Sequence, residues 1–223
     1  MKRQRTLTAC VALVVASVLV AGCGGDDEKS DKADEGKIAG TETTAPAKPS
    51  PTASEAAGEK DGPDLSLPKD VKIVTDWDEP SGAEEAAVLR DARDFTVAFY
   101  RAIAQQDSRD PAYLSYTYPG GNARRIAEKN VRDHVAKKYS VSGTERLTRP
   151  NVEIVHKGST AVVTYCADDT HFYTKDLKAG KPMLTTPSAD DHILFELGMT
   201  AVGKEERWVV KELRSDVGAQ QCQ

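Results

Sequence analysis

The stretch DHILFELGMT, residues 191–200, places four large apolar side chains at every second position. They are Ile193, Phe195, Leu197 and Met199. Side chains two residues apart on a β-strand point to the same face of the sheet. This spacing therefore predicts a strand with one face buried in a core.

Further strands are predicted on both sides of this stretch, each a run of β-forming residues bounded by turn signals. Their approximate ranges are 71–74, 152–154, 161–166, 171–175, 182–186 and 207–213. A glycine-containing turn at 156–159 joins two of them as a hairpin, and Lys178-Ala179-Gly180 joins two more. Successive hairpins predict an antiparallel sheet.

Helical periodicity marks the segment ahead of most of these strands. Ser81 and Glu84 fit a capping box, which predicts a helix from there to about Gln106. Its apolar residues recur at intervals of three and four and form one stripe: Val88, Ala92, Phe95, Phe99 and Ile103. A short helix after Asp110-Pro111 and a third helix over 122–139 follow. Helices followed by strands predict an α+β domain over residues 71–223, with the helices packed on one face of the sheet.

The N-terminus has the order of a secretory signal. Basic residues at positions 2, 3 and 5 precede an uncharged apolar run over 7–20, and Ala21-Gly22 stands before Cys23. The run is about 14 residues long, whereas a membrane-spanning helix needs about 20. Residues 1–22 are therefore predicted to be a signal peptide.

The stretch Val20-Ala21-Gly22-Cys23 resembles the lipobox of bacterial lipoproteins. The resemblance implies that Cys23 carries a diacylglyceryl group and becomes the first residue after cleavage. It also implies that the chain is anchored by this lipid on the outer face of the cell membrane. Ordinary cleavage after Gly22, which would leave Cys23 as a free thiol, is the alternative.

Residues 23–70 are predicted to be a disordered tether. Positions 24–70 hold twelve Asp or Glu against six Lys, and Ile38 is the only large apolar residue between Gly24 and Asp64. Such a composition buries too little apolar surface to offset the entropy of ordering. The chain contains no basic patch with interleaved aromatic residues, which argues against nucleic acid as a partner.

The order of helices and strands is similar to the nuclear transport factor 2-like fold, in which a curved sheet wraps the first helix as a cone. Residues 63–223 also resemble a family of actinobacterial surface lipoproteins that has no assigned activity. The stretches that carry this resemblance are LSLPKDVKIVTDW (65–77), VSGTERLTRPNV (141–152), AVVTYCADDT (161–170), KDLKAGKP (175–182) and RWVVKEL (207–213). It implies a curved, cone-like sheet and an envelope location.

Two functions are compatible with this resemblance. The first is a non-enzymatic display module that binds a small ligand, a wall polymer or an envelope protein. The second is a small pocket enzyme of isomerase or dehydratase type, since enzymes of this superfamily line the cone with Asp, Tyr and His. The candidate pocket residues are Tyr100, Tyr165, Asp168 and His171, with Asp169 and His192 also considered. We expect the module.

Two cysteines follow Cys23, on a strand (Cys166) and near the end of the chain (Cys222). Extracytoplasmic proteins retain disulfides, so we predict a bond between them, with two separate thiols as the alternative. The histidines have no metal-ligand spacing: His134 lacks a second histidine at i+4, and Glu153 and His156 would point to opposite faces of a strand. We expect neither a metal nor a cofactor.

Overall fold

The computed structural model describes residues 62–156, 158–203 and 207–223. The expected signal peptide, the lipid-bearing Cys23 and most of the expected tether lie outside the described residues. In chain order the elements are β1 (Val71–Asp76), α1 (Ala83–Gln105), α2 (Pro111–Ser115), α3 (Asn122–Lys137), β2 (Tyr139–His156), β3 (Thr160–Asp176), β4 (Lys181–Pro182), η1 (Ala189–Asp191), β5 (His192–Val202), β6 (Arg207–Val217) and η2 (Gln220–Cys222).

The sheet has the order β1-β2-β3-β5-β6, and β4 pairs with the outer end of β3. The predicted hairpin around 156–159 is confirmed, with Val152 opposite Val163. The second hairpin is also present, but its returning strand is only Lys181–Pro182. The sheet is mixed rather than purely antiparallel, because β1 pairs parallel with β2. The hairpin rule could not predict this pair, since the three helices α1, α2 and α3 separate its strands.

The strand β2 begins earlier than predicted. The sequence predicted a strand only over 152–154, but β2 already starts at Tyr139 and passes through Gly143. At this position φ is +106° and a Cβ atom would stand 2.0 Å from the His171 carbonyl oxygen. Glycine is therefore required by a close approach of the β2 and β3 backbones, and it does not interrupt the strand.

The long helix α1 forms as its apolar stripe predicts, but its N-terminus differs. The predicted capping box at Ser81 and Glu84 is wrong, because the N-cap is Gly82 and no side chain caps the helix. The Glu84 carboxylate instead accepts the Gly158 backbone N–H at 2.6 Å and so contacts the β2–β3 turn. Glu84 therefore satisfies the backbone N–H of Gly158 in the turn and does not cap the N-terminus of α1.

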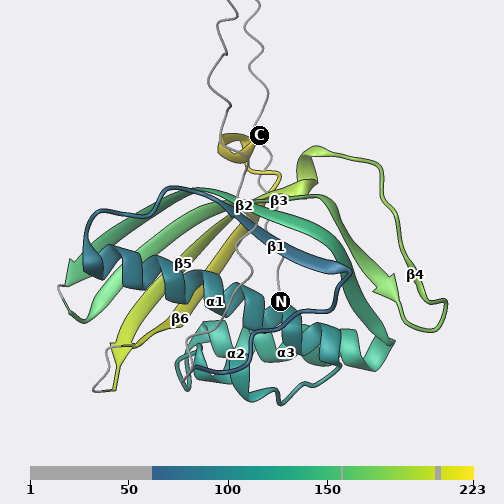
Figure 1. Cartoon of the computed structure of the whole chain (residues 1–223), viewed down its shortest axis with the longest axis horizontal. Helices are drawn as coiled ribbons and strands as arrows, with labels where there is room; N and C mark the ends of the chain where they lie inside the picture. The colour runs from purple at the N-terminus through teal and green to yellow at the C-terminus, as the bar shows by residue number, and fades with distance from the viewer. Residues whose placement is uncertain (1–61, 157, 204–206) are drawn as a thin grey trace, which may run out of the picture. The chain divides into compact units, whose positions relative to one another are not determined.

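The helices cover one face of a curved sheet, so the predicted α+β class with helices on a curved sheet is confirmed (Figure 1). The sheet arches over α1, α2 packs on α1, and α3 packs on both α1 and the β6 end of the sheet. The core is built from the apolar stripe of α1 and the inward residues of the strands; Val88, Ala92, Val163 and Leu197 are each 0% exposed. Within residues 62–223, apart from the undescribed positions, the helices are each too short or too polar to cross a membrane.

Candidate functional site

Two acidic residues lie next to each other on neighbouring strands, at a β-bulge that shifts the register between β2 and β3 by one residue. Thr144 pairs with His171 and Arg146 pairs with Asp168, so Glu145 alone stands opposite Asp169 and Thr170. A bulge of this kind re-aims one side chain toward the face it would otherwise leave. It brings the carboxyls of Glu145 and Asp169 together on the side that α1 covers.

The hydrogen bonds of this pair run through Tyr100 on α1. The Tyr100 hydroxyl donates to Glu145 Oε1 at 2.7 Å. Glu145 Oε2 and Asp169 Oδ1 are both buried, and neither has an N–H or hydroxyl donor among the described residues. Two carboxyl oxygens bond only when one keeps its proton. The pKa of Glu145 is raised well above its ordinary value, which favours Glu145 as the member of the pair that keeps the proton.

Burial governs the protonation of this cluster. Loss of water, followed by the neighbouring Asp169 charge, raises the pKa of Glu145 well above its ordinary value. Burial also raises the pKa of Asp169 to about 7, although the hydrogen bond from Glu145 acts against that rise. Burial and then the Glu145 charge raise the pKa of the Tyr100 phenol. The cluster therefore holds at least one shared proton at neutral pH.

Aromatic side chains close the space around the pair. The Tyr100 ring meets Phe172 edge-on at 4.8 Å between centroids, and Tyr165 stacks on Phe195 at 5.4 Å. The Tyr165 hydroxyl is 2.9 Å from Thr96 Oγ1, and its ring contacts Trp77. Glu145 is 0% exposed and Tyr165 is 2% exposed. A molecule in solvent cannot touch Glu145 unless this packing opens.

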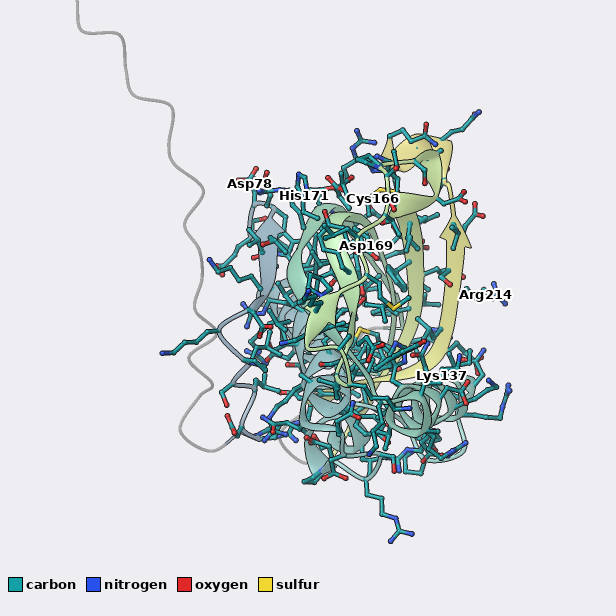
Figure 2. All side chains as sticks on the ribbon, turned by 90° about the vertical axis from the view of Figure 1, so that its right-hand side faces the viewer. Asp78, Lys137, Cys166, Asp169, His171 and Arg214 are labelled. Carbon is teal, nitrogen blue, oxygen red and sulfur yellow. A yellow bond between two sulfur atoms is a disulfide. The ribbon has the colours of Figure 1, made fainter. Side chains whose placement is uncertain are left out.

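The structure brings together only some of the candidate pocket residues. Tyr100 and Tyr165 both lie inside, and Asp169 joins them. Asp168 is directed elsewhere: its carboxylate accepts the Thr170 N–H at 2.9 Å. Burial acts to raise the pKa of Asp168, but the Thr170 bonds and the two nearby histidines outweigh it, so the pKa is lowered. His171 is exposed, with its ring 3.5 Å from the Tyr173 hydroxyl (Figure 2).

Two features of this region differ from the sequence reasoning. Asp168 and Asp169 do not adjoin a strand end, because β3 continues to Asp176. Glu145 was not among the candidates, although it follows Val141 and Gly143 at every second position and precedes Leu147. A charged residue at an inward position was the available signal, and it was missed because the predicted strand began only at 152. Within residues 62–223, leaving out 157 and 204–206, no three His, Cys, Asp or Glu side chains are grouped to hold a metal ion.

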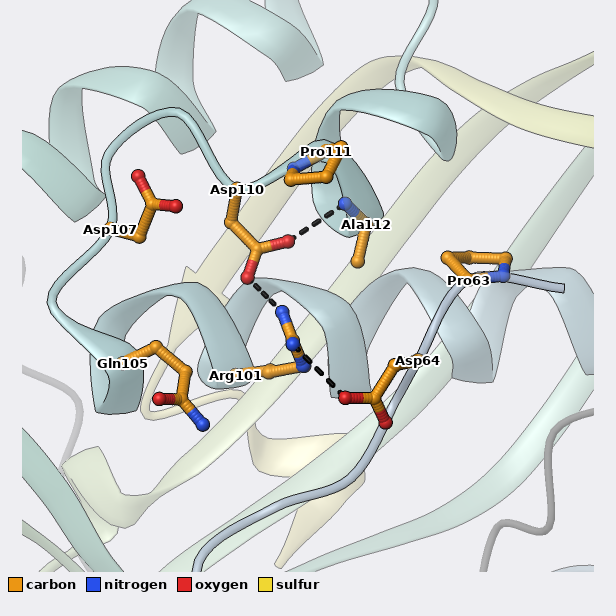
Figure 3. A pocket seen from close by; sticks show the side chains of 8 residues that line it. All are labelled: Pro63, Asp64, Arg101, Gln105, Asp107, Asp110, Pro111 and Ala112. Atoms are coloured by element: carbon orange, nitrogen blue, oxygen red, sulfur yellow. Dashed lines mark hydrogen bonds and ion pairs between the residues drawn. The ribbon is translucent and has the colours of Figure 1, made fainter.

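A second polar site is a cleft of about 440 Å³ beside α1 and the start of α2 (Figure 3). Arg101 lies at its centre and pairs with Asp110 and, at 3.1 Å, with Asp64. Asp110 is 2% exposed and also caps α2 through the Ala112 N–H at 2.7 Å. Next to Asp64, Leu65 is 5% exposed in the main core. The cleft thus fixes residues 64–65, which the sequence had grouped with the tether, to the helices.

The predicted cysteine pair lies on the face of the sheet that the helices do not cover. There it forms a second small hydrophobic cluster with Ala219 and Leu194. The sulfurs of Cys166 and Cys222 are 1.97 Å apart and the Cα atoms are 5.4 Å apart, as a disulfide requires. Arg149 adds a second hold, since its guanidinium donates to the carbonyls of Gln221 and Gln223. Together these contacts secure the residues that follow β6.

Comparison with known proteins gives no relative by sequence: no protein-family model and no curated protein matches the chain. Among solved structures, it is similar to a putative calcium/calmodulin dependent protein kinase II association domain from Xanthomonas campestris, at 16% identity and a TM-score of 0.36 over 63% of this chain and 92% of that one. An NTF-2 like protein of unknown function from Shewanella oneidensis MR-1 matches at 16% identity and 0.34, over 57% and 97%.

A putative ketosteroid isomerase from Shewanella frigidimarina matches at 12% identity and a TM-score of 0.31, over 58% of this chain and 94% of that one. At such scores these likenesses carry no argument about function.

Proposed function

We propose that this chain is a lipid-anchored extracytoplasmic lipoprotein whose folded domain is a non-enzymatic binding or structural module. The anchor rests on the sequence, namely a basic start, a short apolar run and Ala21-Gly22 before Cys23. Two acyl chains on one residue hold a protein stably at a bilayer, whereas a single chain binds only marginally. The acidic segment after Cys23 would then act as the tether of the domain.

The module is supported by the closed interior. The acid–base cluster of the domain is centred on Glu145, which is 0% exposed, and aromatic rings occupy the space around it. Catalysis by proton transfer needs the acid or base within hydrogen-bond reach of the substrate. A carboxyl that no substrate can reach instead serves to fix β2, β3 and α1 in one arrangement.

The second candidate is a small isomerase or dehydratase, and one observation favours it. A protonated carboxyl bonded to a tyrosine hydroxyl at 2.7 Å, beside an acid whose pKa is about 7, is a competent proton donor and acceptor. This function requires the aromatic wall to open for a carbonyl compound. A non-enzymatic module does not require this opening, because its partner would bind the outer surface of the domain.

The anchor is tested by Cys23→Ala, expressed in the native envelope together with the unaltered chain. We expect the unaltered chain to incorporate a fatty-acid analogue and to stay with the membrane fraction after a wash in concentrated salt. The variant should neither be labelled nor withstand the wash. A variant that is still labelled would show that the lipid is not on Cys23.

The choice between module and enzyme is tested by proton exchange. Ketones with acidic α-protons are incubated in D2O with the unaltered chain and with Glu145→Gln, and deuterium incorporation is followed by NMR. The module predicts the uncatalysed rate in both samples. Exchange that is accelerated by the unaltered chain and abolished by Glu145→Gln would replace the module with the enzyme.

A further inference from the structure

An ordered arm projects from the sheet and has no covering in the described part of the chain. It consists of residues 177–190, runs from the end of β3 through β4 to η1, and is exposed at every position. Figure 1 shows it extending away from the body of the domain on the β4 side. Its root is fixed, because Asp176 accepts the backbone N–H groups of Lys178 and Ala179, and the Met183 N–H bonds to Thr174.

The arm carries apolar side chains where water would favour polar ones. Seven large hydrophobic residues are exposed in the described part of the chain, and three of them lie on this arm. Leu184 is 72% exposed, Met183 47% and Leu177 39%. Isolated exposed apolar residues need no explanation, but a cluster on one short segment marks a surface that another phase or molecule covers.

Lysines lie on the arm and beside its root. Lys178 and Lys181 lie on the arm itself. Lys137 and Lys138, at the end of α3, adjoin it, because the Leu177 N–H donates to the Lys138 carbonyl at 3.0 Å. All four are exposed, and the lysine ion pairs within the described residues belong to Lys129 and Lys175 instead. Lysine charges on and beside a segment with exposed Leu and Met suit an anionic surface.

We propose that the arm inserts its apolar side chains into the interface of a bilayer rich in anionic phospholipid, with the lysines on the headgroups. Met183 and Leu184 are consecutive, both are exposed, and neither lies in a strand. A fluid bilayer can cover apolar side chains on such an irregular segment without a surface of matching shape. The biological setting of this contact rests on the proposed membrane anchor, which would hold the arm near the bilayer.

The test uses the chain from position 23 with Cys23→Ser, which cannot carry lipid; the core of the domain lies entirely within the part that remains. Sucrose-loaded vesicles of equal parts phosphatidylglycerol and phosphatidylcholine, or of phosphatidylcholine alone, are sedimented with the protein. We expect binding to the anionic vesicles that is lost in concentrated salt. Leu184→Ser should weaken it by about tenfold, as burial of one leucine side chain implies. Lys178→Gln and Lys181→Gln should each weaken it by about fivefold.

Two controls match these variants in chemistry and exposure. Val155→Ser removes an apolar side chain that is 49% exposed at the β2–β3 end, and Arg214→Gln removes an exposed charge on β6. Both should bind within about twofold of the parent. Near-ultraviolet circular dichroism of Leu184→Ser should match the parent, since its side chain contacts little protein.

The proposal is overturned if the parent does not sediment with the anionic vesicles, or if Leu184→Ser binds as well as the parent does. A dimer in analytical ultracentrifugation that Leu184→Ser dissociates would also overturn it, because the arm would then contact a second copy of the chain and not a bilayer. Failure of this experiment leaves the anchor untouched, because fatty-acid labelling of Cys23 is measured separately.

Discussion

Replacing Glu145 by glutamine should change how the stability of the domain depends on pH. In the unaltered chain the folded pair keeps a proton that the unfolded carboxyls release near their ordinary pKa. Stability is then fully present at low pH and is lost as pH rises through the raised pKa of the folded state. For Asp169, the interval from 3.8 to about 7 corresponds to about 4 kcal/mol of unfolding free energy.

The amide introduced by Glu145→Gln keeps both hydrogen bonds without a proton to lose. Its oxygen can accept from the Tyr100 hydroxyl and its NH2 group can donate to Asp169 Oδ1, while burial still raises the pKa of Asp169. We therefore expect the share of the fall in stability that belongs to Glu145 to be absent in the variant, whereas the share of about 4 kcal/mol that belongs to Asp169 remains, so the variant has the shallower pH slope. Burial also raises the pKa of Asp91, but that residue is the same in both proteins and cancels in the comparison.

The measurement is urea denaturation at constant ionic strength between pH 4.5 and 7.5, followed by tryptophan fluorescence. Trp208 is 3% exposed and Trp77 contacts Tyr165, so both report on the core. Glu153→Gln, an exposed change on the same strand, is the control and should follow the unaltered chain. Equal pH slopes for Glu145→Gln and the unaltered chain would refute the shared proton.

Three further predictions concern stability and are each measured by urea denaturation at pH 7. Cys222→Ser should lower the unfolding free energy by about 4 kcal/mol, because the bond closes a loop with a sequence separation of 56; an unchanged midpoint would contradict this. Gly121→Ala should cost about 1–3 kcal/mol, because its Cβ would stand 2.4 Å from the Lys211 carbonyl oxygen; a neutral effect would mean that the backbone shifts freely. Arg101→Met should cost about 3 kcal/mol by leaving Asp110 buried without its partner, and a more stable variant would show that the ion pair is dispensable.

The sequence predicted those parts of the fold that depend on local repetition. The stripe from Val88 to Ile103 and the alternation from Ile193 to Met199 both follow from the geometry of one element. The hairpin between β2 and β3 follows from a nearby turn, and the cysteine pair follows from the expected compartment. For the helix stripe, the alternating strand and the hairpin, neighbouring residues contain the whole signal.

The remainder depends on contacts between distant segments. Inside a strand, Glu145 contradicts the apolar pattern, and only Tyr100 and Asp169 explain how its carboxyl is accommodated. Arg101 looks like an ordinary polar residue of α1 until Asp64 and Asp110 are seen beside it. Such groups are placed by partners that no periodicity reveals, so the candidate site was predicted only through its tyrosines and Asp169.

The parallel pairing of β1 with β2 has a consequence for how the domain folds. Val71 pairs with Gly143, and the whole of α1, α2 and α3 lies between them in the chain. During synthesis β1 is made well before its partner, so its backbone groups stay unpaired while the helices form. The hairpins of β2, β3, β5 and β6 close much shorter loops and form their contacts sooner. We therefore expect β1 to gain its native contacts last, at the edge of a four-stranded meander that is already assembled around α1.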